Sequence, residues 1–168
     1  GALATGGRAV LVAPPGAGKT TLVPLALLDQ SWVGDGRVVM LEPRRLAARA
    51  AARRMADLLG EAVGDTVGYQ TRDERRIGPA TLIEVLTEGI LTRRLQNDPT
   101  LPGVAVVIFD EVHERNLPTD LGMALTLDVA AAIRPDLRLL AMSATPDTAG
   151  LVRVLGDAPV IETRGQSH

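Results

Sequence analysis

The sequence has no cysteine, one lysine, and one residue each of phenylalanine, tryptophan and tyrosine. Without cysteine the chain can form neither disulfides nor thiolate metal sites, and with so few aromatic residues its core must be filled by aliphatic side chains. No apolar run approaches the roughly 20 residues that a membrane-spanning helix needs. The N-terminus lacks the basic and apolar segments of a signal peptide. We therefore expect a globular protein that acts in the cytoplasm and has no membrane partner.

The remaining composition is that of an ordinary globular domain, with 46% hydrophobic and 23% charged residues. A length of 168 residues suits one domain, 1–168, with a core of its own. The net charge of −2 provides no overall attraction to nucleic acid. Seventeen of the eighteen basic residues are arginine, and the single lysine, Lys19, lies inside a glycine-rich loop. The position of this lysine therefore suggests a functional role.

Short apolar runs alternate with longer stretches that have helical character. The runs 8–13, 37–41, 104–109 and 137–142 are rich in Val and Leu, as buried parallel strands are, and 81–86 resembles them. The expected helices are 19–30, 44–59, 89–97, 117–133 and 148–155. Pro24 falls inside the first helix, where it must kink the helix or leave one backbone bond unmade. This alternation predicts an α/β fold with a mostly parallel sheet, helices on both faces, and ligands at the carboxyl ends of the strands.

The segment "APPGAGKTT", residues 13–21, follows the first expected strand and opens the first helix. Gly16 and Gly18 allow successive backbone N–H groups to point at an anion. Lys19 supplies a charge for the β- and γ-phosphates, and Thr20 supplies a hydroxyl for Mg²⁺. A glycine-proline turn before a helix is the alternative, but a strand before and a helix after favour a phosphate-binding loop. Its expected nucleotide-binding residues are Pro15, Gly16, Ala17, Gly18, Lys19, Thr20 and Thr21.

A second segment with candidate catalytic residues, "FDEVHER" at residues 109–115, ends another expected strand at the same edge of the sheet. Asp110 is expected to hold Mg²⁺ through a water molecule, and Glu111 to orient or deprotonate the attacking water. With Lys19 these are the catalytic candidates, and with Thr20 they are the metal candidates. His113 could link this segment to neighbouring elements. Taken alone the two carboxylates could be a solvated strand end; the phosphate loop upstream favours the functional interpretation.

Five segments occur in one order along the chain: "APPGAGKT", "EPRRLAAR", "TEGIL", "DEVHER" and "MSAT". Together they resemble the DEAH-box helicases of superfamily two, and the longer stretch around "DEVHER" is most similar to bacterial HrpB-type ATP-dependent helicases. The resemblance covers essentially the whole chain. It implies a RecA-like P-loop NTPase domain that uses ATP and Mg²⁺ and acts on single-stranded RNA, or alternatively DNA. Val112 departs from the family, whose name-giving box has alanine there, and we expect it to alter packing and not chemistry.

The resemblance also assigns basic residues. Arg44 and Arg45 match arginines near the RNA backbone, for which a planar guanidinium is well suited, and Arg54 matches an arginine that stacks on the nucleotide base. For Arg49 and Arg53 we favour a solvated helix face. Arg72 lies where the family has an RNA-contacting arginine, although an aspartate follows it in place of the phenylalanine common in eukaryotic relatives.

Two further segments have both a structural and a functional interpretation. Thr87 could cap the helix that follows it or, with Glu88 and Gly89, contact a phosphate of the RNA strand. Ser143, Ala144 and Thr145 end the "MSAT" strand and, in the family, couple hydrolysis to unwinding. A simple turn closed by proline is the alternative for this second segment.

The glutamine- and arginine-rich motif of the family's second RecA-like domain has no counterpart here. The resemblance therefore implies that this chain is the first RecA-like domain and that a second one, with its arginine fingers, is its partner. Two other functions stay open: a different phosphate-loop enzyme such as a small-molecule kinase, and a non-catalytic RNA-binding module with this fold.

Overall fold

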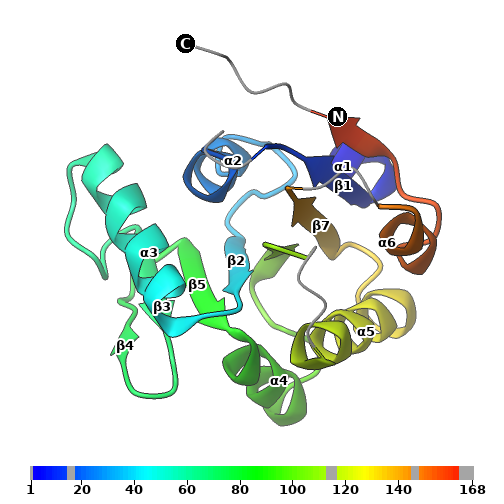
Figure 1. Cartoon of the computed structure of the whole chain (residues 1–168). Coiled ribbons are helices and arrows are strands. Elements are labelled where there is room, and N and C mark those ends of the chain that lie inside the picture. The colour runs from blue at the N-terminus through cyan, green and yellow to red at the C-terminus, as the bar shows by residue number, and fades with distance from the viewer. Residues whose placement is uncertain (1, 15–17, 113–116, 145–147, 163–168) are drawn as a thin grey trace.

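The computed structural model in Figure 1 describes residues 2–14, 18–112, 117–144 and 148–162. Within these ranges eight strands form one sheet in the order β4-β3-β5-β2-β6-β7-β1-β8. Only β3 and β4 pair in antiparallel fashion, and every other neighbouring pair is parallel. The strands are β1 (Arg8–Val12), β2 (Arg37–Glu42), β3 (Val67–Gln70), β4 (Arg75–Arg76), β5 (Ile83–Thr87), β6 (Val104–Phe109), β7 (Arg138–Ser143) and β8 (Val160–Glu162).

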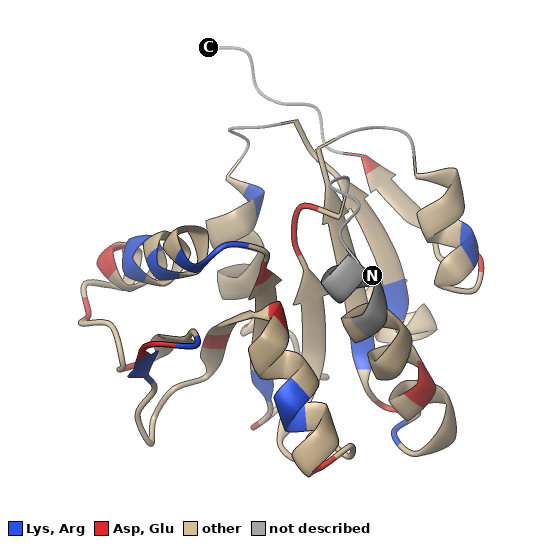
Figure 2. Ribbon diagram, turned by 60° about the horizontal axis from the view of Figure 1, so that its bottom comes forward, with Lys and Arg blue, Asp and Glu red and all other residues tan. Residues whose placement is uncertain are grey.

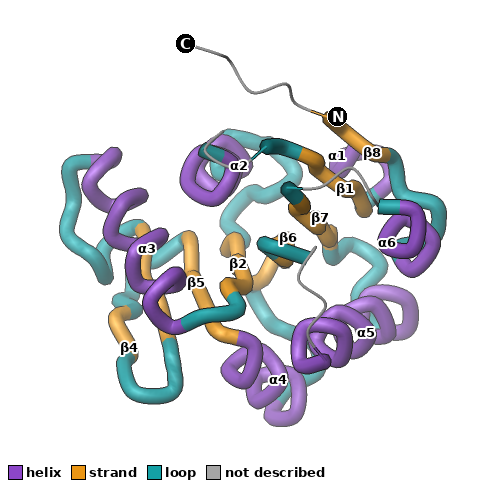
Figure 3. The backbone as a smooth tube through the Cα atoms, in the orientation of Figure 1, coloured by secondary structure: helices purple, strands orange, loops and turns teal. Residues whose placement is uncertain are grey.

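Helices cover both faces of the sheet (Figure 3). The helices are α1 (Ala2–Gly6), α2 (Lys19–Leu27), α3 (Arg45–Leu59), α4 (Glu88–Asn97), α5 (Leu117–Ala132) and α6 (Ala149–Val154). Side chains of α1, α2 and α3 pack on one face, and those of α4, α5 and α6 pack on the other. The two layers explain why the central strands are apolar on both sides: Val106, Val107, Ile108 and Phe109 of β6 are all fully buried.

Helix α3 shows how the sequence sets one of these layers. Its buried residues recur every three or four positions from Ala48 to Ala56, so one face of the helix is apolar and the arginines lie on the other. Gly60 follows the helix with φ of 68°, the left-handed conformation that glycine adopts most readily at a helix end. Small alanine side chains let α3 lie close to the sheet.

The α/β architecture with a mostly parallel sheet agrees with the prediction from the sequence. Elements α1, β3, β4 and β8 were not predicted, because they contain at most five residues and carry too little periodicity. The first long helix ends at Leu27, three residues earlier than predicted. Pro24 lies buried within it, where the proline ring replaces the N–H that would bond to the carbonyl of Thr20.

The parallel arrangement brings five strand ends to one edge of the sheet. Strands β1, β2, β5, β6 and β7 end there, and the five sequence segments singled out above all begin or end at these points. Among the described residues, no helix combines the length and the apolar character that crossing a bilayer requires.

Candidate nucleotide site

The glycine-rich loop joins β1 to α2, as its sequence predicts. Gly18 immediately precedes α2 with φ of 77°, and its carbonyl accepts a hydrogen bond from the amide of Leu22 at 2.8 Å. A side chain at Gly18 would be strained by this left-handed conformation and would also lie within 3.0 Å of Leu22 Cδ1. Glycine is therefore required here for geometric reasons. Pro15, Gly16 and Ala17 lie outside the described residues.

Lys19 and Thr20, the first two residues of α2, both bond to Asp110 at the end of β6. The ammonium of Lys19 donates to Oδ1 at 3.2 Å, and the hydroxyl of Thr20 donates to Oδ2 at 2.9 Å. Asp110 is only 3% exposed, so these bonds stabilise a buried carboxylate. The structure thus brings together the phosphate loop and the acidic box.

A third acidic residue, Glu42, also contacts Asp110. Glu42 ends β2, the strand beside β6, and is 2% exposed. Burial, together with its hydrogen bond to Asp110 and the negative charges of Asp110 and Glu111, raises the pKa of Glu42 to about 10. The neutral carboxyl of Glu42 therefore donates a hydrogen bond to the carboxylate of Asp110. Its Oε1 is buried and has no hydrogen-bond partner among the described residues.

The pKa of Asp110 is shifted in the opposite direction. Burial by itself would raise its pKa, but the hydrogen bond from Glu42, the charge of Lys19 and the hydroxyl of Thr20 outweigh burial and lower the pKa. Asp110 therefore stays ionised while Glu42 stays neutral. An ionised carboxylate at the end of β6 is the form that can bind a metal ion or its water ligands.

Glu111 adopts a conformation that is unusual for a residue with a side chain. Its φ is 56°, in the left-handed region, and its amide donates to Oδ1 of Asp110 at 2.9 Å. Strain of this kind is tolerated where surrounding bonds enforce it, and it is found preferentially at functional sites. The side chain of Glu111 lies at the nucleotide pocket described below.

The end of β7 is joined through the main chain both to the start of the glycine-rich loop and to the acidic box. The carbonyl of Ser143 accepts the amide of Ala13 at 3.0 Å, and the carbonyl of Met142 accepts the amide of Val112 at 3.1 Å. The end of the "MSAT" strand is therefore joined to the acidic box through main-chain hydrogen bonds. Val112 itself packs against the hydrophobic core. His113 and Thr145 lie outside the described residues.

These strand ends enclose a pocket of about 610 Å³. Arg54, on the exposed side of α3, lies at this pocket together with Lys19 and Thr20. The pocket is lined by Gly18, Lys19, Thr20, Thr21, Glu42, Ala47, Ala50, Ala51, Arg54, Glu111 and Ala144. Its volume falls in the range of small-molecule sites.

Oxygen ligands in this pocket fit Mg²⁺, although the described residues contain no ready-made cage of three or more His, Asp or Glu. Mg²⁺ commonly uses one or two protein oxygens, nucleotide phosphates and several waters. The hydroxyl of Thr20 and the carboxylate of Asp110 are adjacent oxygens of this kind. The unpartnered Oε1 of Glu42 lies in the same cluster. The donor set therefore suits a hydrated metal ion.

The candidate RNA-binding residues lie beside the pocket, at the start of α3 and on the loop between β3 and β4. Residues 44–57 and 72–76 contain eight arginines and three acidic residues, although the whole chain has a net charge of −2. Figure 2 shows the basic residues gathered along α3. Arg44, Arg45 and Arg72 are all exposed. This surface is the most basic part of the chain.

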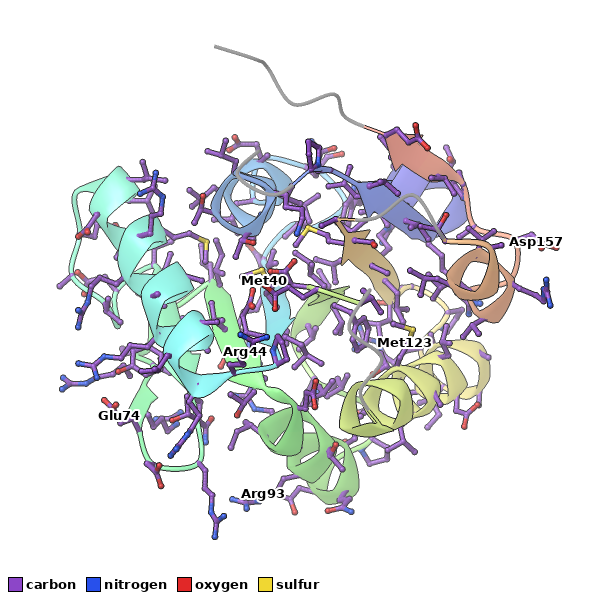
Figure 4. The ribbon with its side chains drawn as sticks, viewed as in Figure 1. Met40, Arg44, Glu74, Arg93, Met123 and Asp157 are labelled. Atoms are coloured by element: carbon purple, nitrogen blue, oxygen red, sulfur yellow. The ribbon has the colours of Figure 1, made fainter. Side chains whose placement is uncertain are left out.

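Carboxylates of the β3–β4 loop pair with arginines of α3. Asp73 forms an ion pair with Arg45. Glu74, which is labelled in Figure 4, forms a longer ion pair with Arg49, at 3.6 Å. Glu74 also accepts a hydrogen bond from the hydroxyl of Tyr69 at 2.8 Å. The loop is thereby attached to the start of α3, and Asp73 occupies one guanidinium that is a candidate for RNA.

The "TEG" segment lies at the start of α4. Thr87 occupies the N-cap position but makes no side-chain capping bond, so its hydroxyl does not serve as the cap. Glu88 is buried and Gly89 is exposed. A contact from this segment to a nucleic-acid strand would therefore use Thr87 and the exposed backbone at Gly89, and not the carboxylate of Glu88.

Sequence reasoning missed Glu42 as a member of the site. The residue was visible in "EPRR", but its proximity to Asp110 depends on β2 lying next to β6 in the sheet. Strand order cannot be determined from one sequence. A glutamate at the end of an apolar strand, at the edge where ligands bind, was the only available signal.

Comparison with known proteins supports the same assignment of the chain. The model of the DEAD/DEAH box helicase family matches residues 2–153. The ATP-dependent RNA helicase HrpB of Escherichia coli (strain K12) is 52% identical over 160 residues, which is 95% of this chain and 20% of that protein. The ATP-dependent RNA helicase DHX30 of Gallus gallus is 40% identical over 164 residues, 93% of this chain and 13% of that protein.

Solved structures agree. A crystal structure of the E. coli DExH-box NTPase HrpB superposes with a TM-score of 0.94 at 52% identity, over 99% of this chain and 20% of the other. A second E. coli HrpB structure gives a TM-score of 0.90 over 95% of this chain. The chain thus spans about one fifth of these relatives, and the expected RecA-like fold is confirmed. This chain belongs to the DEAD/DEAH box helicase family.

Proposed function

We propose that the chain is the nucleotide-binding half, the first RecA-like domain, of an ATP-dependent RNA helicase. One observation carries the proposal: Lys19 and Thr20 both bond to the buried Asp110, and both line the pocket that Arg54 borders. A loop lysine, an adjacent hydroxyl and a carboxylate at a nearby strand end are the groups that a Mg²⁺-nucleotide requires.

In this proposal each residue has one task. Lys19 contacts the β- and γ-phosphates, and the backbone amides at the start of α2 lie around them. Thr20 and Asp110 would hold Mg²⁺, which neutralises charge on the phosphates when it is bound. Glu111 orients the attacking water and accepts its proton. Arg54 stacks on the base, which binds nucleotides without selecting strongly among bases.

RNA would follow the surface formed by Arg44, Arg45, Arg72 and the segment Thr87–Gly89. These groups suit the sugar-phosphate backbone of a single strand and do not present a pattern for reading bases, so binding should tolerate many sequences. DNA with the same backbone charge would be a weaker alternative ligand. Because ATP and RNA occur together in the cytoplasm, we place the protein there.

Complete catalysis would require a second RecA-like domain. Lys19, Thr20, Asp110 and Glu111 account for phosphate binding, metal binding and water activation. Charge that develops on the γ-phosphate still needs an arginine finger, which in related systems contributes about 10³ to 10⁵ in rate. Among the described arginines at the site, Arg54 borders the pocket and is assigned to the base. The finger would therefore come from the partner domain.

ATP hydrolysis by the 168-residue chain and by a longer chain with both domains, each with and without single-stranded RNA, tests the proposal. We expect the short chain to bind MgADP yet hydrolyse ATP barely above background, and the long chain to show RNA-stimulated turnover. Glu111→Gln in the long chain should abolish turnover and keep nucleotide binding. RNA-stimulated hydrolysis by the short chain at a comparable rate would contradict the need for a partner domain, and failure to bind MgADP would contradict the nucleotide site.

A further inference from the structure

Glu42 is the acidic side chain of the pocket to which the proposed mechanism gives no role. It is 2% exposed, it hydrogen-bonds to Asp110, and it lines the nucleotide pocket beside Lys19, Thr20 and Glu111. Its Oε1 is buried without a hydrogen-bond partner among the described residues. Burying a polar atom without a hydrogen-bond partner is energetically unfavourable. Such an atom in a ligand pocket calls for an explanation.

The position of Glu42 follows from the sheet. Strand β2 lies between β5 and β6, with Leu41 paired to Phe109, so the next residues of the two strands, Glu42 and Asp110, lie side by side. The amide of Asp110 also donates to the carbonyl of Leu41 at 3.2 Å. The backbone therefore places the two residues side by side, and their side chains form the hydrogen bond between them.

A second buried glutamate provides a contrast. Glu84, on β5, is 1% exposed, and its two carboxyl oxygens accept hydrogen bonds from Arg94 at 3.0 and 3.2 Å. Arg37 adds an ion pair at 3.4 Å. Glu84 thus has the partners that a structural buried carboxylate needs. Glu42, by contrast, has one carboxyl oxygen without a hydrogen-bond partner among the described residues, and Glu42 is the one of the two glutamates that lines the nucleotide pocket.

We propose that Glu42 is a positioning residue of the metal site, in which its bond to Asp110 orients that carboxylate and its Oε1 accepts a hydrogen bond from a water molecule bound to Mg²⁺. This inference rests on the proposed nucleotide site. Mg²⁺ gives up its waters reluctantly and commonly retains several of them in protein sites. Groups that bond to such ligands, without touching the metal, tune its affinity.

This role predicts a specific effect of Glu42 on how strongly ADP binding depends on metal. A residue that acts on the hydrated metal strengthens nucleotide binding only when metal is present, whereas a purely structural residue changes binding with and without metal alike. The measurable quantity is the metal enhancement: the ratio of the ADP dissociation constant in EDTA to that in excess Mg²⁺. Calorimetric titration of the 168-residue chain gives both constants without requiring catalysis.

Glu42→Leu removes both oxygens at similar volume and should lower the metal enhancement about tenfold, the lower end of the effect of such outer groups. Glu42→Gln can donate its amide to Asp110 and keep its carbonyl oxygen for the water, so it should retain the enhancement within about threefold. Glu84→Gln, the matched control, changes a buried glutamate away from the pocket and should leave the enhancement unchanged. If the leucine variant does not fold, Glu42→Met carries the same expectation.

The possible outcomes distinguish failure of the role proposed for Glu42 from failure of the proposed nucleotide site. An enhancement in Glu42→Leu equal to that of the unaltered chain overturns the role of Glu42 and leaves the nucleotide site intact. Equal weakening of ADP binding in EDTA and in Mg²⁺ also overturns it, because that result indicates a structural role. If the unaltered chain binds no ADP under either condition, the proposed nucleotide site fails and this inference fails with it.

Discussion

The ammonium nitrogen of Lys19 lies 3.2 Å from Oδ1 of Asp110, although 91 positions separate the two residues in the sequence. Asp110 is buried, so its charge needs a cationic partner or several hydrogen bonds. Lys19 is the only lysine in the chain. In the proposed function the same ammonium group serves both this carboxylate and the phosphates of a bound nucleotide, so the site should be sensitive to single changes of charge.

Lys19→Ala should remove measurable MgADP binding, because the chain has no other lysine that could contact the phosphates. It should also lower the free energy of unfolding by about 1.5 to 3 kcal/mol, the value for a lost hydrogen bond to a charged group. The loss stays below that of a fully orphaned buried charge, because Thr20, Glu42 and the amide of Glu111 still bond to Asp110. Calorimetry and chemical denaturation measure the two effects.

Lys19→Arg is the control for this substitution. It retains the charge beside Asp110, so stability should be largely restored, but the larger guanidinium should not restore tight phosphate binding. Wild-type affinity for MgADP in Lys19→Ala would contradict the assigned role of the lysine.

Arg54→Ala should weaken ADP and GDP binding to the same extent, by roughly threefold to tenfold, as expected for a partly exposed cation–π contact. In the unaltered chain the two nucleotides should differ by less than about tenfold, or roughly 1.4 kcal/mol, because stacking does not read base edges. Titrations with both nucleotides test this. Arg53→Ala is the matched control, since Arg53 is the adjacent residue of α3 and does not line the nucleotide pocket. A strong preference for adenine would refute base stacking without selection.

Asp73→Asn should strengthen binding of single-stranded RNA several-fold, because it releases Arg45 from an ion pair and removes a negative charge near the phosphates. Arg45→Ala should weaken binding on all sequences and reduce the dependence of log affinity on log salt by about one phosphate contact. Fluorescence anisotropy over a salt series measures both effects.

The double variant shows whether Asp73 acts through Arg45. If it does, adding Asp73→Asn to Arg45→Ala should recover little affinity. Arg153→Ala, an exposed arginine on α6 outside the basic surface, should have no effect. Equal gains from Asp73→Asn with and without Arg45 would show that Asp73 acts only through general electrostatics.

The metal-free protein should lose stability as pH rises. Burial raises the pKa of Glu42 from 4.5 to about 10, so between these values the folded chain keeps a proton that the unfolded chain releases. The stabilisation is fully present below the lower value and is lost as pH rises toward the higher one. Glu42→Gln cannot ionise and escapes this loss. The free energy of unfolding of Glu42→Gln, relative to that of the unaltered chain, should therefore increase as pH rises.

Denaturation in EDTA at about pH 5, 7 and 9 measures this difference. EDTA keeps metal from contributing its own charge at Asp110. A gap between the two proteins that stays constant over this range would show that Glu42 does not hold its proton in the folded chain.

The chemistry of the site was predictable from sequence because its main parts are local. Gly18, Lys19 and Thr20 form a continuous loop whose residue types suit phosphate, and Asp110 and Glu111 follow an apolar strand directly. Parallel strands present their carboxyl ends at one edge of a sheet, so the meeting of these two segments followed from the alternation of strands and helices. The fold class and the core of the nucleotide site therefore follow from the types of these residues and their order along the chain.

Other relationships depend on the order in which distant strands pair. Glu42 touches Asp110 because β2 lies beside β6, and Asp73 reaches Arg45 because β3 and β4 form an antiparallel pair at the edge of the sheet, beneath α3. Both arrangements result from packing of the whole sheet and its two helical layers, and this packing leaves no pattern near either residue. The sequence by itself determined which groups could bind phosphate and metal, while the tertiary structure decided which buried carboxyl lies against Asp110 and which arginine is paired with Asp73.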